Sequence, residues 1–192
     1  MVTITIRTST TRVRLVEPGE TVLTVPYGVD GDPRKRFVNL REHPDRIDQI
    51  EALHRMAALR EQIMLLNRRD SPFMTFACTA WTTRLFQQAG PPAWRTSSSV
   101  WLAFVGAASR GLRRYIALAR AFLDVLDTAG RADRWNSVIE LQPKPVVFNL
   151  ERPSWSMCIP TSGYGLDTRA AMLELELCLR AQTDLFRSRI WR

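Results

Sequence analysis

The sequence predicts an α+β fold that is predominantly α-helical, and three observations predict it. The first 25 residues alternate apolar and polar side chains with the period of two that half-buried strands show. Most of the chain between residues 44 and 142 instead carries apolar residues at helical spacing, as does the C-terminal stretch. Two short extended runs lie on either side of residue 151. We therefore expect four to five helices around a central apolar helix, with a small antiparallel sheet built from an N-terminal meander and a C-terminal hairpin.

The N-terminal strands follow from this alternation. Three extended runs end near Ile6, Leu15 and Val25, and the sequence Glu17-Pro18-Gly19-Glu20 separates the last two. Proline presets φ for the second position of a turn, and glycine tolerates positive φ at the third. We expect a three-stranded meander with a tight turn before its last strand.

The helical region begins at Pro44, because proline is tolerated in the first turn of a helix, and its first helix should reach about Arg69. Ser71-Pro72 is a second start signal. From there to residue 88 apolar residues cover most of the helix circumference, which is typical of a central helix. Gly90-Pro91-Pro92 should end it. A third helix is expected from Ser97 to Gly130, with a bend near Gly106 or Gly111, and a short fourth one over 131–141.

The C-terminal region predicts a hairpin followed by a helix. After the breaker Pro143-Lys144-Pro145, strands are expected at 146–150 and 154–159, and the glycines of 160–165 should turn the chain. Asp167 or Thr168 should cap a helix that continues to Arg192. We expect one domain, 1–192, with these parts: a β meander at 1–26, a basic loop at 27–43, a helical core at 44–142, a β-hairpin and turn at 143–165, and a C-terminal helix at 166–192.

The basic inventory is lopsided, since the chain has 25 arginines and only two lysines, with a net charge of +8 and a pI of about 10.4. A guanidinium grips two phosphate or carboxylate oxygens at once, whereas an ammonium is a mobile point charge. This charge favours approach to a polyanion or an acidic partner. The alternative is a GC-rich genome that encodes arginine wherever a cation is needed.

Candidate nucleic-acid-binding residues come from the placement of these arginines. On a helical wheel around residue 115, apolar residues fill one half, and four arginines share an arc on the other. Arg120 can pair with Asp124 or Asp127, which leaves the other three unpaired. The alternative is a face that simply faces water. The candidates are Arg110, Arg113 and Arg114 on this helix, Arg34, Lys35 and Arg36 in the basic loop, and Arg12 and Arg14 on the second strand.

Tryptophans beside arginines are candidates for stacking on bases or for anchoring an interface. The alternatives are an arginine lying over a half-buried ring, and cations that stabilise the C-terminal end of a helix through its dipole. Trp81 and Trp101 lie in apolar runs and are expected in the core. The candidates are Trp94, Trp135, Arg187, Arg189, Trp191 and Arg192.

Catalytic, metal and cofactor sites are not predicted. The two histidines lie in no HxxxH pattern, and the three cysteines form no CxxC pair. Cys78 has no cationic neighbour to lower its pKa and looks inert. There is neither a Walker lysine nor a GxSxG elbow. We therefore lean against an enzyme and expect no cofactor.

The expected location is the cytoplasm. The cysteines are odd in number and flanked by apolar residues, which favours buried thiols in a reducing compartment over disulfides. The longest apolar run is about half of the roughly 20 residues that a membrane span needs, so no membrane partner is expected.

These expectations converge on a non-enzymatic subunit, from a prokaryote or a phage, that binds the nucleic-acid backbone without reading sequence. In size, charge and helicity the chain resembles the helical small subunits of multi-subunit RNA-guided effector complexes. The resemblance implies a role in covering RNA or DNA backbones inside a ribonucleoprotein, beside other protein subunits. The alternative is a structural or assembly protein of a phage or mobile element, which self-associates or binds an acidic partner through Arg and Trp anchors.

Overall fold

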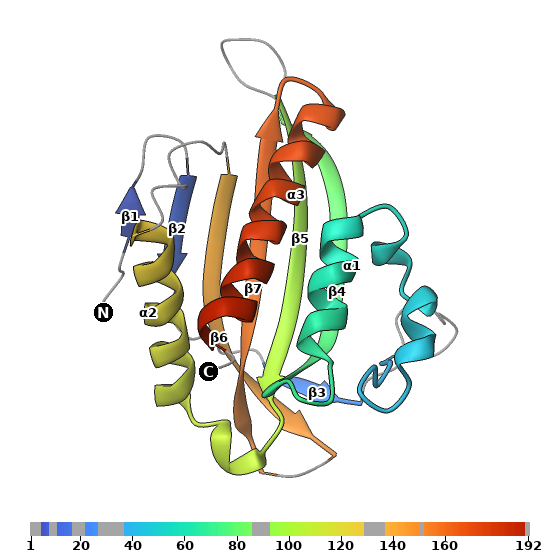
Figure 1. Cartoon of the computed structure of the whole chain (residues 1–192), viewed down its shortest axis with the longest axis vertical. Helices are drawn as coiled ribbons and strands as arrows, with labels where there is room; N and C mark the ends of the chain where they lie inside the picture. Colours follow the sequence, from blue (N-terminus) through green and yellow to red (C-terminus); the bar gives the residue numbers. More distant parts are fainter. Residues whose placement is uncertain are drawn as a thin grey trace.

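The computed structural model describes residues 5–7, 11–16, 22–26, 37–85, 93–128, 137–149 and 152–190, with the backbone alone at 5–7, 11–13, 107, 125–128 and 189–190. Its centre is a seven-stranded mixed sheet, and helices lie over one face of that sheet (Figure 1). The fold is a sheet-rich α+β fold, so the expectation of a predominantly helical protein is wrong. The resemblance to helical effector subunits therefore loses its helical component.

The strands are β1 (Thr5–Arg7), β2 (Thr11–Leu15), β3 (Leu23–Val25), β4 (Phe73–Leu85), β5 (Ala93–Phe104), β6 (Ser137–Phe148) and β7 (Ser154–Gly165). They follow the order β1-β2-β6-β7-β5-β4, and β3 pairs with β6. The helices are α1 (Ala57–Leu66), α2 (Leu112–Thr128) and α3 (Thr168–Leu185), and α3 continues into a π-helical turn, Phe186–Ile190. Short 3-10 helices lie at Pro44–Gln49, Glu51–Leu53 and Ala107–Ser109.

The predicted central helix over 72–88 is strand β4, and the first part of the predicted helix from Ser97 is strand β5. A continuous apolar run fits a strand buried on both faces as well as a buried helix, so periodicity does not separate the two. Composition does separate them, because β4 is rich in threonine and aromatic residues, which favour strands. In β5, Ser97–Ser99 are residues that compete with the backbone inside a helix. The predicted helix at 44–69 is likewise shorter, since only α1 is α-helical there.

The N-terminal strands exist, but the three-stranded meander is wrong. β1 and β2 form the expected antiparallel pair, with Thr5 opposite Arg14. β3 does not pair with β2. Instead, β2 runs parallel to Ser137–Leu141 of β6, and β3 runs parallel to Val146–Phe148 of the same strand. The turn predicted at 17–20 and residues 27–36 of the basic loop predicted at 27–43 lie outside the described residues.

The predicted breaker Pro143-Lys144-Pro145 lies inside β6, which also replaces the end of the short helix predicted at 131–141; residues 131–136 lie outside the described part of the chain. Both prolines fall between the stretch of β6 that pairs with β2 and the stretch that pairs with β3. Proline is tolerated in a strand where its missing N–H interrupts no ladder. The hairpin predicted around residue 151 is confirmed, but its strands are longer than expected.

The glycines predicted to turn the chain at 160–165 lie within strand β7, directly under α3. A Cβ atom on Gly163 would lie 2.4 Å from the backbone nitrogen of Leu175 and 2.5 Å from the carbonyl oxygen of Ala171. A Cβ on Gly165 would lie 2.5 Å from the nitrogen of Ala171. Glycine in a strand often marks such a close approach of another backbone. The helix begins where predicted, because the Asp167 side chain accepts a hydrogen bond from the Ala170 N–H at 2.7 Å.

The main core lies between the sheet and the helices. Phe73 of β4 packs against Phe104 of β5, with ring centroids 4.9 Å apart, and Phe186 contacts the rings of both Phe73 and Phe122. A second, smaller cluster comprises Val25, Phe76, Ala103, Val146 and Phe148, and Trp101 packs against it. Trp81, which was expected in the core, is 42% exposed, so that expectation is wrong.

We expect Gly163→Ala to lower the free energy of unfolding by about 3 kcal/mol, because the new methyl group would meet two backbone atoms that cannot move without displacing α3. Chemical denaturation followed by circular dichroism measures the change. Gly106→Ala is the matched control, because its Cβ would meet only the Ser109 hydroxyl at an ordinary 3.6 Å. Equal stability of the two variants would contradict the close packing of α3 on β7.

Candidate nucleic-acid interface

Arg110, the first candidate for phosphate binding, is buried and serves the fold. Its side chain is 9% exposed and precedes α2 rather than lying on the helix face. Its Nε donates a hydrogen bond to the carbonyl oxygen of Phe104 at 2.8 Å, and its Nη2 donates to that of Val105 at 3.1 Å. The guanidinium also lies 4.1 Å from the centre of the Phe148 ring. Arg110 therefore fastens the end of β5 to the start of α2 and is not available to a ligand.

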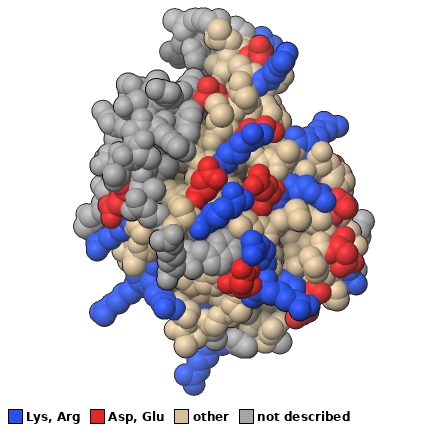
Figure 2. All heavy atoms as spheres, viewed as in Figure 1, with Lys and Arg blue, Asp and Glu red and all other residues tan. Residues whose placement is uncertain are grey.

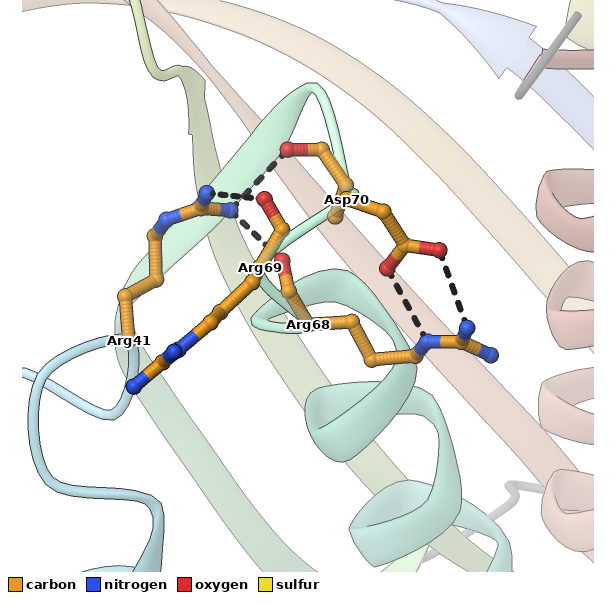
Figure 3. A network of polar contacts seen from close by, with 5 residues as sticks. Arg41, Arg68, Arg69 and Asp70 are labelled. Atoms are coloured by element: carbon orange, nitrogen blue, oxygen red, sulfur yellow. Dashed lines mark hydrogen bonds and ion pairs between the residues drawn. The ribbon is translucent and has the colours of Figure 1, made fainter.

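Arg41 has the same role at the neighbouring strand, and the sequence analysis did not single it out within the basic loop. Figure 3 shows its guanidinium directed at the turn between α1 and β4. Its Nη1 donates to the carbonyl oxygens of Arg68, Ser71 and Phe73 at 2.8 to 2.9 Å, and its Nη2 donates to that of Arg69 at 2.8 Å. The fork geometry of arginine makes this multiple contact feasible, whereas charge alone would not predict it.

Arg113 and Arg114 lie in the first turn of α2, and both side chains are exposed. Among the described residues, neither forms an ion pair with an acid. The Arg114 guanidinium lies 5.3 Å from the centre of the Phe104 ring, which holds its stem against the protein. Cations are disfavoured at the N-terminal end of a helix, because the helix dipole is positive there. Helix stability therefore gives no reason for this pair.

Of the two candidates on β2, Arg14 is already engaged with Glu140 of β6. The Arg14 Nε donates to the Glu140 Oε1 at 2.7 Å, and the Nη2 bonds the same oxygen. The Arg12 side chain lies outside the described residues, as do the candidates Arg34, Lys35 and Arg36.

Two of the six stacking and interface candidates have described side chains, and both contact other parts of the fold. Arg187, one of the interface candidates, pairs with Glu61 of α1 at 3.0 Å and with Asp184 at 3.5 Å. Trp94 is half-buried in β5, opposite Gly165 of β7. The remaining candidates lie outside the described side chains: Trp135, Arg189, Trp191 and Arg192.

The face that carries the helices has mixed charge. In Figure 2, Lys and Arg side chains alternate with Asp and Glu over this face. Three arginines pair with neighbouring acids: Arg60 with Asp48 at 2.6 Å, Arg68 with Asp70 at 2.9 Å, and Arg180 with Glu176 at 3.7 Å. The last is the i,i+4 pair that the sequence predicts. The Arg60 guanidinium beside Asp48 holds the pKa of that carboxyl below its usual value.

In the described part of the chain, the cysteines and histidines form neither an activated nucleophile nor a metal-binding group. Burial raises the pKa of Cys78, Cys158 and Cys178 to about 12, and all three are free thiols. His54 is exposed, and its Nε2 lies 2.7 Å from the carbonyl oxygen of Asp48. Within the described residues, no group of three His, Cys, Asp or Glu side chains is placed to hold a metal ion.

The helices were also compared with the length and hydropathy of membrane spans. No helix within the described ranges combines the length and the apolar character that crossing a membrane requires.

Comparison with known proteins adds no functional information. No family model, no curated protein and no solved structure matches the chain. The interpretation of the site therefore depends on its geometry and charge alone, and Arg113 and Arg114 are exposed candidates that form no ion pair with an acid among the described residues.

Arg110→Lys should lower the free energy of unfolding by about 2 kcal/mol, because a lysine keeps the charge but cannot donate to two carbonyl oxygens from one planar group. Thermal or urea denaturation measures this loss. Binding of nucleic acid by the folded variant should remain unchanged. A stable variant that loses nucleic-acid binding would show that Arg110 contacts the ligand after all.

The three thiols should react slowly with a disulfide reagent at pH 8 in the native protein. A pKa of about 12 in place of 9.0 reduces the thiolate fraction about a thousandfold. The reaction is followed by absorbance with and without denaturant, and unfolding should release all three thiols to rapid reaction. One thiol that reacts rapidly in the native state would contradict this assignment.

Proposed function

We propose that the protein is a non-enzymatic subunit of a larger nucleoprotein complex that binds the nucleic-acid backbone without reading sequence. The observation that carries this proposal is the exposed pair Arg113 and Arg114, which no described acid neutralises, on a chain with a net charge of +8. A guanidinium grips phosphate oxygens through two parallel hydrogen bonds. Contacts of this kind position a protein on a strand but carry no sequence information.

The use that the fold makes of its other arginines supports this choice. Arg41 and Arg110 donate to backbone carbonyl oxygens, so their guanidinium N–H groups are engaged within the fold. Arg180 and Arg187 are exposed and Arg60 is partly buried, and each has a carboxylate within 4 Å. A phosphate would have to displace that carboxylate. The arginines at the start of α2 have no such competitor among the described residues.

The local field at this position also favours an anion. The N-terminal end of α2 carries the positive end of the helix dipole. Arg113 and Arg114 add two full charges beside it. Together these groups give a concentrated positive potential at one end of α2, whereas the paired arginines elsewhere give alternating signs.

The decisive experiment compares the double variant Arg113→Ala/Arg114→Ala with the wild type in binding labelled single and double strands. We expect at least a tenfold loss of affinity at about 50 mM salt. The slope of log affinity against log salt should become less steep by about 1.4 to 1.8, because each lost phosphate contact removes about 0.7 to 0.9. The matched control is Arg60→Ala/Arg180→Ala, which removes the same charge from two paired arginines and should change affinity less than threefold.

Equal losses in the two double variants would show that net charge, rather than this site, determines binding. No binding by the wild type at low salt would overturn the proposal. An assembly protein that binds other proteins through Arg and Trp residues would then be the better explanation.

A further inference from the structure

The outer edge of β4 begins with hydrogen bonds that the fold supplies from side chains. The Phe73 N–H donates to the Ser71 hydroxyl at 3.1 Å, and its carbonyl oxygen accepts from Arg41 at 2.9 Å. The Thr75 N–H donates to Asn67 Oδ1 at 3.0 Å. Residues 73 and 75 therefore direct their backbone groups away from β5, and side chains bond both groups of Phe73 and the N–H of Thr75.

Beyond this point the edge continues without such partners from the described chain. A register shift between Thr75 and Ala77 inserts one extra residue, so the alternation of the antiparallel ladder places the backbone groups of Cys78, Ala80 and Thr82 on the outer side. No described segment forms a backbone hydrogen bond with these three residues on that side. β4 is the last strand in the order of the sheet, as Figure 1 shows.

A groove of about 830 Å³ follows this part of the edge. Residues 78 to 82 all line it, although their side chains alternate between the two faces of the sheet. A groove that five consecutive strand residues share must run along the backbone edge itself. Its opposite wall is formed by residues 50–52 and 54–56, with Met172 of α3 contributing to the apolar part.

Apart from the bulge between Thr75 and Ala77, the strand lacks two devices by which proteins often block an open edge, proline and a series of charged side chains. It contains no proline, and Arg84 is its only charged residue. Trp81, Thr82 and Thr83 are exposed there. Such an edge is a template for another strand.

We propose that the groove beside residues 78 to 82 binds one extended, acidic segment of a partner protein, which adds to β4 as a further strand. Main-chain hydrogen bonds supply the affinity in this mode, and alternate side chains enter the groove. The wall at 50–56 favours a single segment over a second copy of this chain. In an antiparallel pairing about a two-fold axis, both helical layers lie on the same side of the joined sheet, and the two walls would collide.

The positive charge of this chain indicates that the partner segment is acidic. The net charge of +8 repels another basic chain, and Arg55 in the groove wall and Arg84 on the strand are both exposed. Glu51 is the acidic residue of the wall, so the wall itself is not uniformly positive. The overall field therefore favours a partner with acidic residues at the positions that face solvent.

The test uses the full chain and two amidated hexapeptides, one alternating valine with glutamate and one alternating valine with lysine. We expect the acidic peptide to bind at least tenfold more tightly and to slow hydrogen exchange at the Ala80 and Thr82 amides at least tenfold. Thr82→Glu, which places an acid in the groove, should weaken acidic-peptide binding at least tenfold. Thr83→Glu is the matched control, since Thr83 is exposed on the same strand but does not line the groove, and it should change binding less than threefold.

Ala80→Pro removes one outward N–H without breaking the pairing of β4 with β5, and it should also abolish binding. If that variant fails to fold, the pair Thr82→Glu and Thr83→Glu still decides the question. Unchanged exchange at both amides at millimolar peptide, equal binding of the two peptides, or equal effects of the two glutamate variants would overturn the proposal. The Arg113→Ala/Arg114→Ala protein should bind the acidic peptide normally, which separates this site from the proposed nucleic-acid interface.

Discussion

The fold depends on the direct contact between the backbones of α3 and β7. Gly163 and Gly165 have no side chains to hold the helix away, so α3 lies deep on the sheet. At this depth Gln182 can donate to the Thr161 hydroxyl at 2.8 Å and accept from Gln62 of α1 at 3.1 Å, which fixes α1 beside α3. The turn that follows α3 then places Phe186 between Phe73 and Phe122. One close approach thus positions both neighbouring helices and the aromatic part of the core.

A second constraint is the corner where β4 begins and β5 ends. Phe73 and Phe104 are opposite each other in the ladder, and one arginine donates to the carbonyl oxygen of each: Arg41 to Phe73 and Arg110 to Phe104. A carbonyl oxygen at such a junction has lost its regular partner, and leaving it buried without one costs about 1 to 3 kcal/mol. Arginine can satisfy several at once. Some of the arginines in this lysine-poor chain therefore serve the fold. A count of charges does not distinguish these arginines from arginines that bind a ligand.

The sequence predicts those parts of the fold in which a local signal has one meaning. Strict alternation identifies β1 and β2, amphipathic spacing identifies α2, and Asp167 marks the start of α3. The long apolar run of β4 fits both kinds of element and therefore predicts a helix as readily as a strand. The glycines of β7 predict a turn, because the sequence does not show that α3 packs directly over them. Likewise, Arg110 and Arg113 look alike on a helical wheel. Only tertiary packing shows that the first is buried and the second is exposed.

The two proposed surfaces lie at different places on the sheet, and this separation is relevant to a subunit of a complex. α2 packs over β2, β6 and β7, whereas the open edge belongs to β4, the last strand beyond β5 (Figure 1). Strands lie about 4.8 Å apart, so the two strands between β6 and β4 separate the proposed phosphate-binding end of α2 from the β4 groove by more than a Debye length at physiological salt. Charges on one ligand are therefore largely screened from the other. A nucleic-acid strand and an acidic protein segment can occupy the same molecule without competing for its positive charge, which suits a protein that joins the two.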